Sequence, residues 1–266
     1  MARVITITSG KGGVGKTTTT ANLGTALAMR GNRVAVIDAD IGLRNLDVVM
    51  GLENRIVYDL VDVVEGRARL RQALIKDKRL PELCLLPAAQ TRDKDAVSPE
   101  NMIDLTNQLR NDFDFILIDS PAGIEGGFRN AIAGADEVII VTTPEVSAVR
   151  DADRIVGLVE ASEKGPPSLI VNRIKPRLVS RGEMLSVDDV LELLMITLVG
   201  IVPDDETIVT STNRGEAAVY DQTSAAGKAF LNIARRLNGD TVPFLALQEQ
   251  PGMLERLIGM FGRRRS

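Results

Sequence analysis

A glycine-rich stretch near the N-terminus, SGKGGVGKTT, is the part of the sequence best suited to chemistry. Gly10, Gly12 and Gly15 match the dinucleotide-binding pattern G-x-G-x-x-G. Together with Lys16 and Thr17, the same stretch also matches the triphosphate-binding pattern G-x-x-x-x-G-K-[ST]. Both patterns use glycine because a backbone without Cβ atoms lets several N–H groups converge on phosphate oxygens. Other residues must therefore distinguish the two ligands.

Lys16 and Thr17 favour a nucleoside triphosphate with Mg²⁺. The lysine would place a charge beside the β- and γ-phosphates and the threonine hydroxyl would bind the metal, whereas a dinucleotide needs neither. Asp38 ends the next expected strand and would suit a dinucleotide ribose. Asp119, however, ends the apolar strand FILID, where a carboxylate near a phosphate-bound metal is expected. The remaining alternative is a loop that only joins a strand to a helix.

The composition excludes several classes of function. Without histidine, the chain has no histidine general base, histidine metal site or Ser-His-Asp triad. The single cysteine, Cys84, cannot form an internal disulfide, which fits a reducing cytosol. The chain is acidic apart from a basic C-terminal end, so we expect no sequence-specific binding of nucleic acid.

Short apolar strands alternate with helical segments along the chain. Expected strands cover residues 3–8, 33–38, 83–87, 114–119, 137–143, 168–173 and 197–203, and expected helices cover 16–30, 56–64, 98–111, 147–163 and 224–239. This alternation predicts an α/β fold with a doubly wound, mostly parallel sheet. We expect one domain over residues 1–240, a linker over 241–251 and an amphipathic helix over 252–266. No apolar run approaches the ~20 residues that span a bilayer, which predicts a soluble chain.

A second lysine in the glycine loop, Lys11, identifies a narrower family. The segment KGGVGKT at residues 11–17 resembles the deviant Walker A loop of the MinD/ParA family of P-loop ATPases. The resemblance implies ATP as the nucleotide and a homodimer in which Lys11 reaches the phosphates bound by the partner subunit. Hydrolysis would then depend on dimerisation. A solvated loop lysine is the simpler alternative.

Two further segments resemble the switch regions of that family, DADIGLRNLD and DSPAGIE. The resemblance implies that Asp40 orients the attacking water, so that Lys11, Lys16 and Asp40 are the catalytic residues. Thr17, Asp38 and Asp119 would hold Mg²⁺. Asp38 could instead cap backbone amides after its strand.

The nucleotide-binding residues follow from the loop and from two later segments, LIVNR and VPDDE, which match the adenine-pocket positions of the family. The Asn172 amide would pair with the adenine edge, although Asn172 could equally be a turn residue. The expected set is Gly10, Lys11, Gly12, Gly13, Val14, Gly15, Lys16, Thr17, Thr18, Asn172, Arg173, Pro203 and Asp204.

The C-terminal segment PGMLERLIGMFGRRRS has the pattern of a helix that lies on an anionic membrane. At 100° per residue its apolar side chains fall within an arc of roughly 160°. A helix packed on its own domain is the alternative, but three glycines weaken an autonomous helix. Two such tails on an ATP-bound dimer would bind better than one. The expected membrane residues are Met253, Leu254, Leu257, Ile258, Phe261, Arg263, Arg264 and Arg265.

The loop, the switch segments, TTPEVSAVRDADR and the tail together resemble the septum-site-determining branch of the family. This implies a division-site ATPase on the cytoplasmic face of the membrane, which places the inhibitor MinC and is released by MinE-stimulated hydrolysis. Asp151, with Arg44 and Asn45, is expected to contact these partners.

Other functional classes remain open at this point. A DNA-bound or plasmid-partition ATPase and a flagellar-number ATPase share the loop. A nucleotide-dependent synthase or ligase would need an acceptor motif, and a nicotinamide oxidoreductase would bind NAD. Nitrogenase iron proteins are excluded because their cluster needs more cysteines than Cys84 alone.

Overall fold

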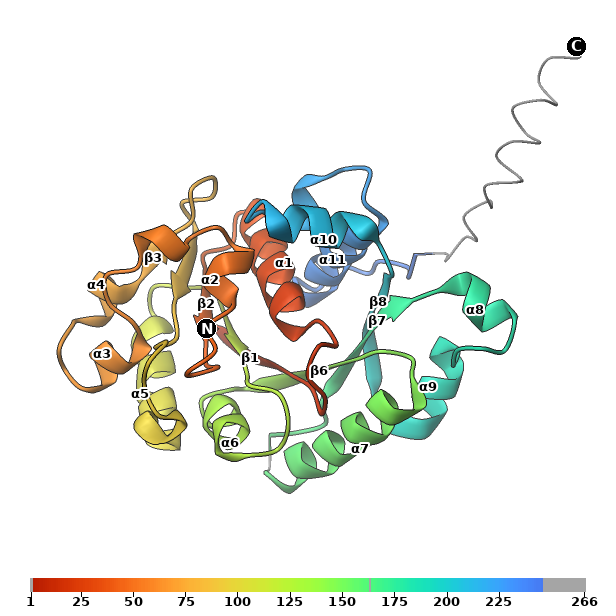
Figure 1. Ribbon diagram of the computed structural model, residues 1–266, viewed down its shortest axis with the longest axis horizontal. Coiled ribbons are helices and arrows are strands. Elements are labelled where there is room, and N and C mark those ends of the chain that lie inside the picture. Colours follow the sequence, from red (N-terminus) through yellow and green to blue (C-terminus); the bar gives the residue numbers. More distant parts are fainter. Residues whose placement is uncertain (1, 163, 246–266) are drawn as a thin grey trace, which may run out of the picture.

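The computed structural model describes residues 2–162 and 164–245, and shows an eight-stranded sheet between two layers of helices (Figure 1). The strand order is β3-β4-β2-β5-β1-β6-β7-β8, and all neighbouring strands run parallel except β3 and β4. The expected doubly wound sheet is confirmed. The strands are β1 Arg3–Thr8, β2 Val34–Asp38, β3 Ile75–Lys76, β4 Leu83–Leu86, β5 Phe115–Asp119, β6 Glu137–Thr142, β7 Ser168–Ile174 and β8 Thr197–Pro203.

The helices cover both faces of the sheet, as right-handed crossovers between parallel strands require. Helices α1, α2, α10 and α11 lie on one face, and α5, α6, α7 and α9 lie on the other (Figure 1). The helices are α1 Lys16–Met29, α2 Leu46–Val49, α3 Leu60–Val64, α4 Leu70–Ala73, α5 Pro99–Leu109, α6 Gly126–Ala133, α7 Val146–Ala161, α8 Pro176–Ser180, α9 Val187–Leu194, α10 Glu206–Asn213 and α11 Ala225–Leu237.

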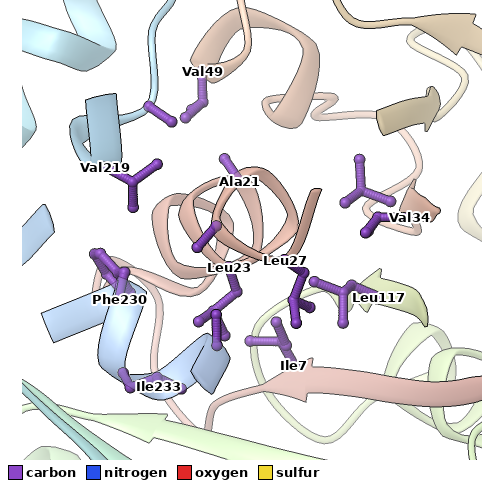
Figure 2. Close-up of a cluster of buried hydrophobic side chains, with 14 of the residues drawn as sticks. Ile7, Ala21, Leu23, Leu27, Val34, Val49, Leu117, Val219, Phe230 and Ile233 are labelled. Atoms are coloured by element: carbon purple, nitrogen blue, oxygen red, sulfur yellow. The ribbon is translucent and has the colours of Figure 1, made fainter. Parts of the chain in front are cut away.

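Helix α1 packs on the sheet with α11 beside it and α2 above it, and so it carries apolar or small residues on most sides. Figure 2 shows Leu23 and Leu27 facing Ile7 of β1, with Phe230 of α11 closing the same cluster. At Gly24 a Cβ atom would lie 2.7 Å from Val36 Cγ1 of β2, so glycine allows α1 to approach the sheet closely. The N-terminus of α1 is thereby held rigidly beside the ends of the central strands.

The carboxyl ends of the parallel strands meet at one edge of the sheet, where the candidate functional residues collect. The glycine loop follows β1, and Asp38 and Asp119 end β2 and β5. Strand β1 lies between β5 and β6, so the direction of winding changes beside it. Ligands of open α/β sheets bind in the crevice at such a point.

The chain beyond α11 contacts the domain as far as Leu245, past the expected boundary at residue 240. The expected linker residues 246–251 and the predicted membrane residues lie outside the described part of the chain. Within the described part, no helix is both long enough and apolar enough to cross a membrane. The predicted membrane residues that lie outside the described part are Met253, Leu254, Leu257, Ile258, Phe261, Arg263, Arg264 and Arg265.

Candidate functional site

The glycine loop between β1 and α1 forms an anion-binding cradle. Gly15, the residue before α1, has φ of 100°, and Gly13 has φ of 78°; both values favour glycine. A Cβ atom on Gly15 would lie 2.3 Å from Asn172 Nδ2, and one on Gly10 would lie 2.2 Å from the Asp151 carbonyl oxygen. Among the described residues, no side chain caps the first N–H groups of α1. These N–H groups are therefore directed at the place where a phosphate would bind.

Lys16, the first residue of α1, is a buried cation beside two carboxylates. It is 8 % exposed, and burial lowers its pKa while the charges of Asp119 and Asp40 oppose that shift. A charge held at the N-terminus of a helix adds to the positive end of the helix dipole. The position is suited to neutralising a phosphate group.

Asp119 and Asp38 form a pair of buried carboxylates at the ends of β5 and β2, opposite each other in the strand register. Burial, and then the charge of Asp38, raises the pKa of Asp119 to about 7. Hydrogen bonds from the Thr17 and Thr20 hydroxyls oppose the shift, with Thr20 Oγ1 at 3.3 Å. Two neighbouring buried carboxylates strongly favour a cation between or beside them.

These residues fit Mg²⁺ that is held together with a nucleotide. Within residues 2–162 and 164–245, no three histidine, cysteine or acidic side chains cluster closely enough to hold a metal by themselves. Mg²⁺ typically binds one or two carboxylates and completes its shell with water and phosphate oxygens. The structure brings together Thr17, Asp38 and Asp119, the three residues that the sequence predicts for this role.

Asp38 also has a structural role that the sequence left open. Its Oδ1 accepts a hydrogen bond from the backbone N–H of Asp40 at 3.0 Å, and its Oδ2 accepts from those of Asn45 and Leu46, each at 3.1 Å. Burial raises the pKa of Asp38 to about 6, and these amides oppose the shift. The Asp38 carboxylate therefore links the expected Mg²⁺ site to the backbone of the first switch segment.

Asp40, Arg44 and Asn45, the predicted residues of the first switch segment, lie in different surroundings. Asp40 lies close enough to Lys16 to raise its pKa. Arg44 has φ of 40° and its Nε lies 3.1 Å from Oδ2 of the fully buried Asp47, so its guanidinium is directed inward. Asn45, which precedes α2, is exposed. Asp47 was missed at sequence level, because nothing in the local pattern marks it as buried.

The Lys11 side chain reaches the N-terminal end of α7. Its side chain is 44 % exposed; Nζ donates to Ser147 Oγ at 3.1 Å and lies 3.9 Å from Glu145 Oε2. Asp151, further along α7, contacts Gly10 through its backbone and lies 3.9 Å from the Arg154 guanidinium. The structure therefore brings Gly10 and Lys11 of the loop to the first half of α7, where Asp151 lies. Glu145 and Ser147 were missed because they join the site only through folding.

A cavity of about 390 Å³ lies next to the cradle. Gly15 and Thr18 line its loop side. The four residues expected around a base, Asn172, Arg173, Pro203 and Asp204, line the rest together with Glu145, Lys175, Met184, Asp205, Ile208, Val209 and Phe230, most of which the sequence did not indicate.

Asn172 is the residue that ties this cavity to the glycine loop. It is 6 % exposed, its Nδ2 donates to the Val14 carbonyl at 2.8 Å, and its Oδ1 accepts from the Arg173 N–H at 2.9 Å. An amide side chain has two donors and two acceptor positions, so one of each is left for a ligand. Arg173 has φ of 56°, which turns the chain at the rim.

The cradle, the buried lysine and the paired carboxylates define a P-loop nucleoside triphosphatase of the deviant Walker A type. The family model of the CobQ/CobB/MinD/ParA nucleotide binding domain matches residues 5–219 of this chain. The septum site-determining protein MinD of Bacillus subtilis is 56 % identical over 99 % of this chain and 100 % of its own. The MinD protein of Escherichia coli K12 is 50 % identical, with 97 % and 100 % covered.

Solved structures agree with these relatives. The Aquifex aeolicus MinC:MinD cell division complex contains a chain with a TM-score of 0.86 and 51 % identity, covering 92 % of this chain and 99 % of that one. MinD of Pyrococcus horikoshii complexed with Mg-ADP gives 0.81 and 30 % identity, covering 90 % and 96 %. The chain belongs to the MinD/ParA family, among the septum-site-determining MinD proteins. It is an ATP hydrolase.

Proposed function

We propose that this ATPase dimerises on ATP and selects the site of cell division from the cytoplasmic face of the membrane. In its ATP-bound dimer it carries the division inhibitor MinC, and MinE-stimulated hydrolysis releases it. The observation that carries the proposal is the position of Lys11. This lysine belongs to the phosphate loop in sequence, yet its ammonium group lies outside its own cradle, at the surface beside α7.

The placement of Lys11 supports a role in the site of a second subunit. An exposed cation beside the cradle is free to exchange its contacts with Ser147 and Glu145 for the phosphates of a facing copy. A positive charge supplied in trans stabilises the charge that develops on the transferred phosphoryl group. Dimerisation then controls hydrolysis, because each site is completed by its partner.

Within one site, the residues of this chain position and stabilise rather than act as strong bases. Lys16 and the N–H groups of the cradle bind the phosphates, and Asp40 orients the attacking water. Thr17, Asp38 and Asp119 would hold Mg²⁺, which would supply positive charge beside the phosphates. Asn172 directs its remaining donor and acceptor at the adenine edge. Phosphoryl transfer needs no strong base, so the lack of histidine is no obstacle.

The partners follow from relatives and from the sequence. The MinC:MinD complex of Aquifex aeolicus supports MinC as a partner. Asp151, on α7 near the Lys11 contacts, and Asn45, before α2, are the proposed docking residues for MinC and MinE, and Arg44, which is paired with Asp47, is the third. Residues 252–266 bind the anionic membrane surface, and the pair of tails on a dimer supplies the avidity that one tail lacks.

Vesicle co-sedimentation tests the proposal directly. The full chain and a chain ending at residue 251 are compared with vesicles rich in phosphatidylglycerol, in the presence of ATP or ADP. We expect strong sedimentation only for the full chain with ATP. Equal binding in all four conditions would contradict the ATP-controlled membrane cycle. A matched test with phosphatidylcholine vesicles separates attraction to anionic lipid from nonspecific binding.

A further inference from the structure

The chain is held firmly after α11, in a way that the ATPase site does not require. The chain turns at Gly239, which has φ of 91°. Asp240 then accepts from Arg30 at 3.0 Å and from Arg235 at 3.3 Å. Its backbone N–H donates to the Arg235 carbonyl at 3.0 Å. The path of the chain is therefore fixed as it leaves the helix.

Arg236, on the last turn of α11, fastens the next residues to the sheet. Its Nε donates to the Val242 carbonyl at 3.0 Å and its Nη2 to the Pro243 carbonyl at 2.8 Å. Its Nη1 donates to the Val199 carbonyl of β8 at 3.2 Å. The guanidinium carbon lies 4.2 Å from the centre of the Phe244 ring. All three guanidinium nitrogens thus join the segment 241–245 to strand β8.

These contacts require an arginine. The guanidinium presents its donors in a rigid planar fork and stacks on aromatic rings, whereas a lysine offers one point charge. Pro243 restricts the backbone at the centre of the segment. Leu245 packs against the core cluster around α1 and α11. The described chain therefore ends at a defined point beside β8, the strand at one end of the sheet.

We propose that Arg236 is a positioning residue, which anchors the departure point of the C-terminal segment and so sets its reach toward the membrane. The consequence for membrane binding rests on the proposed function. With the anchor in place, seven residues of sequence separate Leu245, the last residue held on the domain, from Met253, the first apolar residue of the expected membrane segment. Without it, twelve residues separate Asp240 from Met253. Effective concentration falls with about the 3/2 power of the length of chain between two attachment points, so releasing the anchor weakens binding of the second tail by roughly twofold.

The anchor can be observed without a membrane. The chain contains no tryptophan, so Phe244→Trp introduces a single reporter that stacks on Arg236. In this background we compare Arg236 with Arg236→Lys, which keeps the charge and loses the fork. The control is Arg235→Lys on the same helix, because Arg30 also contacts Asp240. We expect Arg236→Lys to lower the fluorescence anisotropy and to increase acrylamide quenching at least twofold, and the control to change neither. Unchanged basal ATP turnover shows that the domain is folded.

The same full-length variants, without the reporter, are then titrated with phosphatidylglycerol-rich vesicles in ATP. We expect about twofold weaker binding by Arg236→Lys and native binding by Arg235→Lys. If the reporter is equally immobile in both variants, the anchor is overturned. If the reporter is released while vesicle binding stays native, the effect on reach is overturned. Failure of the native chain to bind vesicles would instead contradict the proposed function, and the reporter would still decide the anchor.

Discussion

The carboxylates of Asp38 and Asp119 lie opposite each other at the ends of two neighbouring parallel strands, buried from solvent. Burial is the main cause that raises the pKa of Asp38 to about 6, and burial with the Asp38 charge raises that of Asp119 to about 7. An aspartate in the unfolded chain titrates near 4. The pair therefore favours the folded state when protonated, and this contribution is lost as pH rises from about 4 through 7.

Asp119→Asn should remove the Asp119 share of this pH dependence from the nucleotide-free protein, while the share of the buried Asp38 remains. Between pH 4.5 and 7.5, the native free energy of unfolding should fall by about 1–3 kcal/mol more than that of the variant. Urea unfolding over this pH range measures the difference. The exposed Asp104→Asn on α5 is the control and should follow the native curve. Parallel curves for native protein and Asp119→Asn would show that the pKa of Asp119 is not raised in the folded protein.

Gly10 and Gly12 form a matched pair for the close contact between the loop and α7. A Cβ atom on Gly10 meets the Asp151 backbone, whereas no described atom lies within 4 Å of one on Gly12. Gly10→Ala should lower the free energy of unfolding by about 2 kcal/mol or more, and Gly12→Ala should change it by under about 0.5 kcal/mol. Thermal and urea unfolding give both values. Equal losses would mean that the loop yields without strain.

If Lys11 acts in the partner's site, as proposed, Lys11→Ala should retain some nucleotide binding and lose stimulated turnover. Asp40→Ala should bind nucleotide and fail to hydrolyse it. Mixing the two variants forms heterodimers in which one site has its own Asp40 and a Lys11 from the partner. Stimulated ATPase activity, measured with vesicles and MinE, should therefore reappear in the mixture. The exposed Lys228→Ala on α11 is the single-variant control. A mixture as inactive as its components would refute the trans role.

Asn172→Asp should disturb both the glycine loop and the base cavity. The substitution replaces the donor that reaches the Val14 carbonyl with a charged acceptor, so two acceptors face each other in a buried place. We expect a stability loss of about 1–3 kcal/mol and about tenfold weaker ATP binding, equivalent to about 1.4 kcal/mol. Thermal unfolding and titration with a fluorescent ATP analogue measure the two effects. Asn107→Asp, exposed on α5, should change neither.

The sequence predicts the parts of this fold that depend on patterns of residues close together in the chain. The buried strands have continuous apolar runs, and the glycine loop with Lys16 and Thr17 has its own pattern, so the sheet and the family could be inferred. Strand β3 was not predicted because two residues carry no periodicity. Its pairing with β4 depends on contacts made after folding.

The site shows the same division between local and distant information. Asn172 and Asp204 could be chosen from short segments, and the structure places both around one cavity, although their roles stay predictions. Phe230 and Met184 line that cavity from separate helical and loop regions, and no local signal links them to a nucleotide. Asp38 was interpreted from the sequence either as a metal ligand or as a cap of backbone amides. The structure is compatible with both interpretations, because the carboxylate caps the switch amides and also faces Asp119.

The two edge strands of the sheet, β3 and β8, affect how readily copies of the chain could pair through their sheets. One end is closed by the short antiparallel strand β3, and the other, β8, has its Val199 carbonyl occupied by Arg236. Exposed strand edges are templates for pairing between molecules, and short or obstructed edges suppress it. The two edges of this sheet therefore carry features that disfavour pairing between copies of the chain.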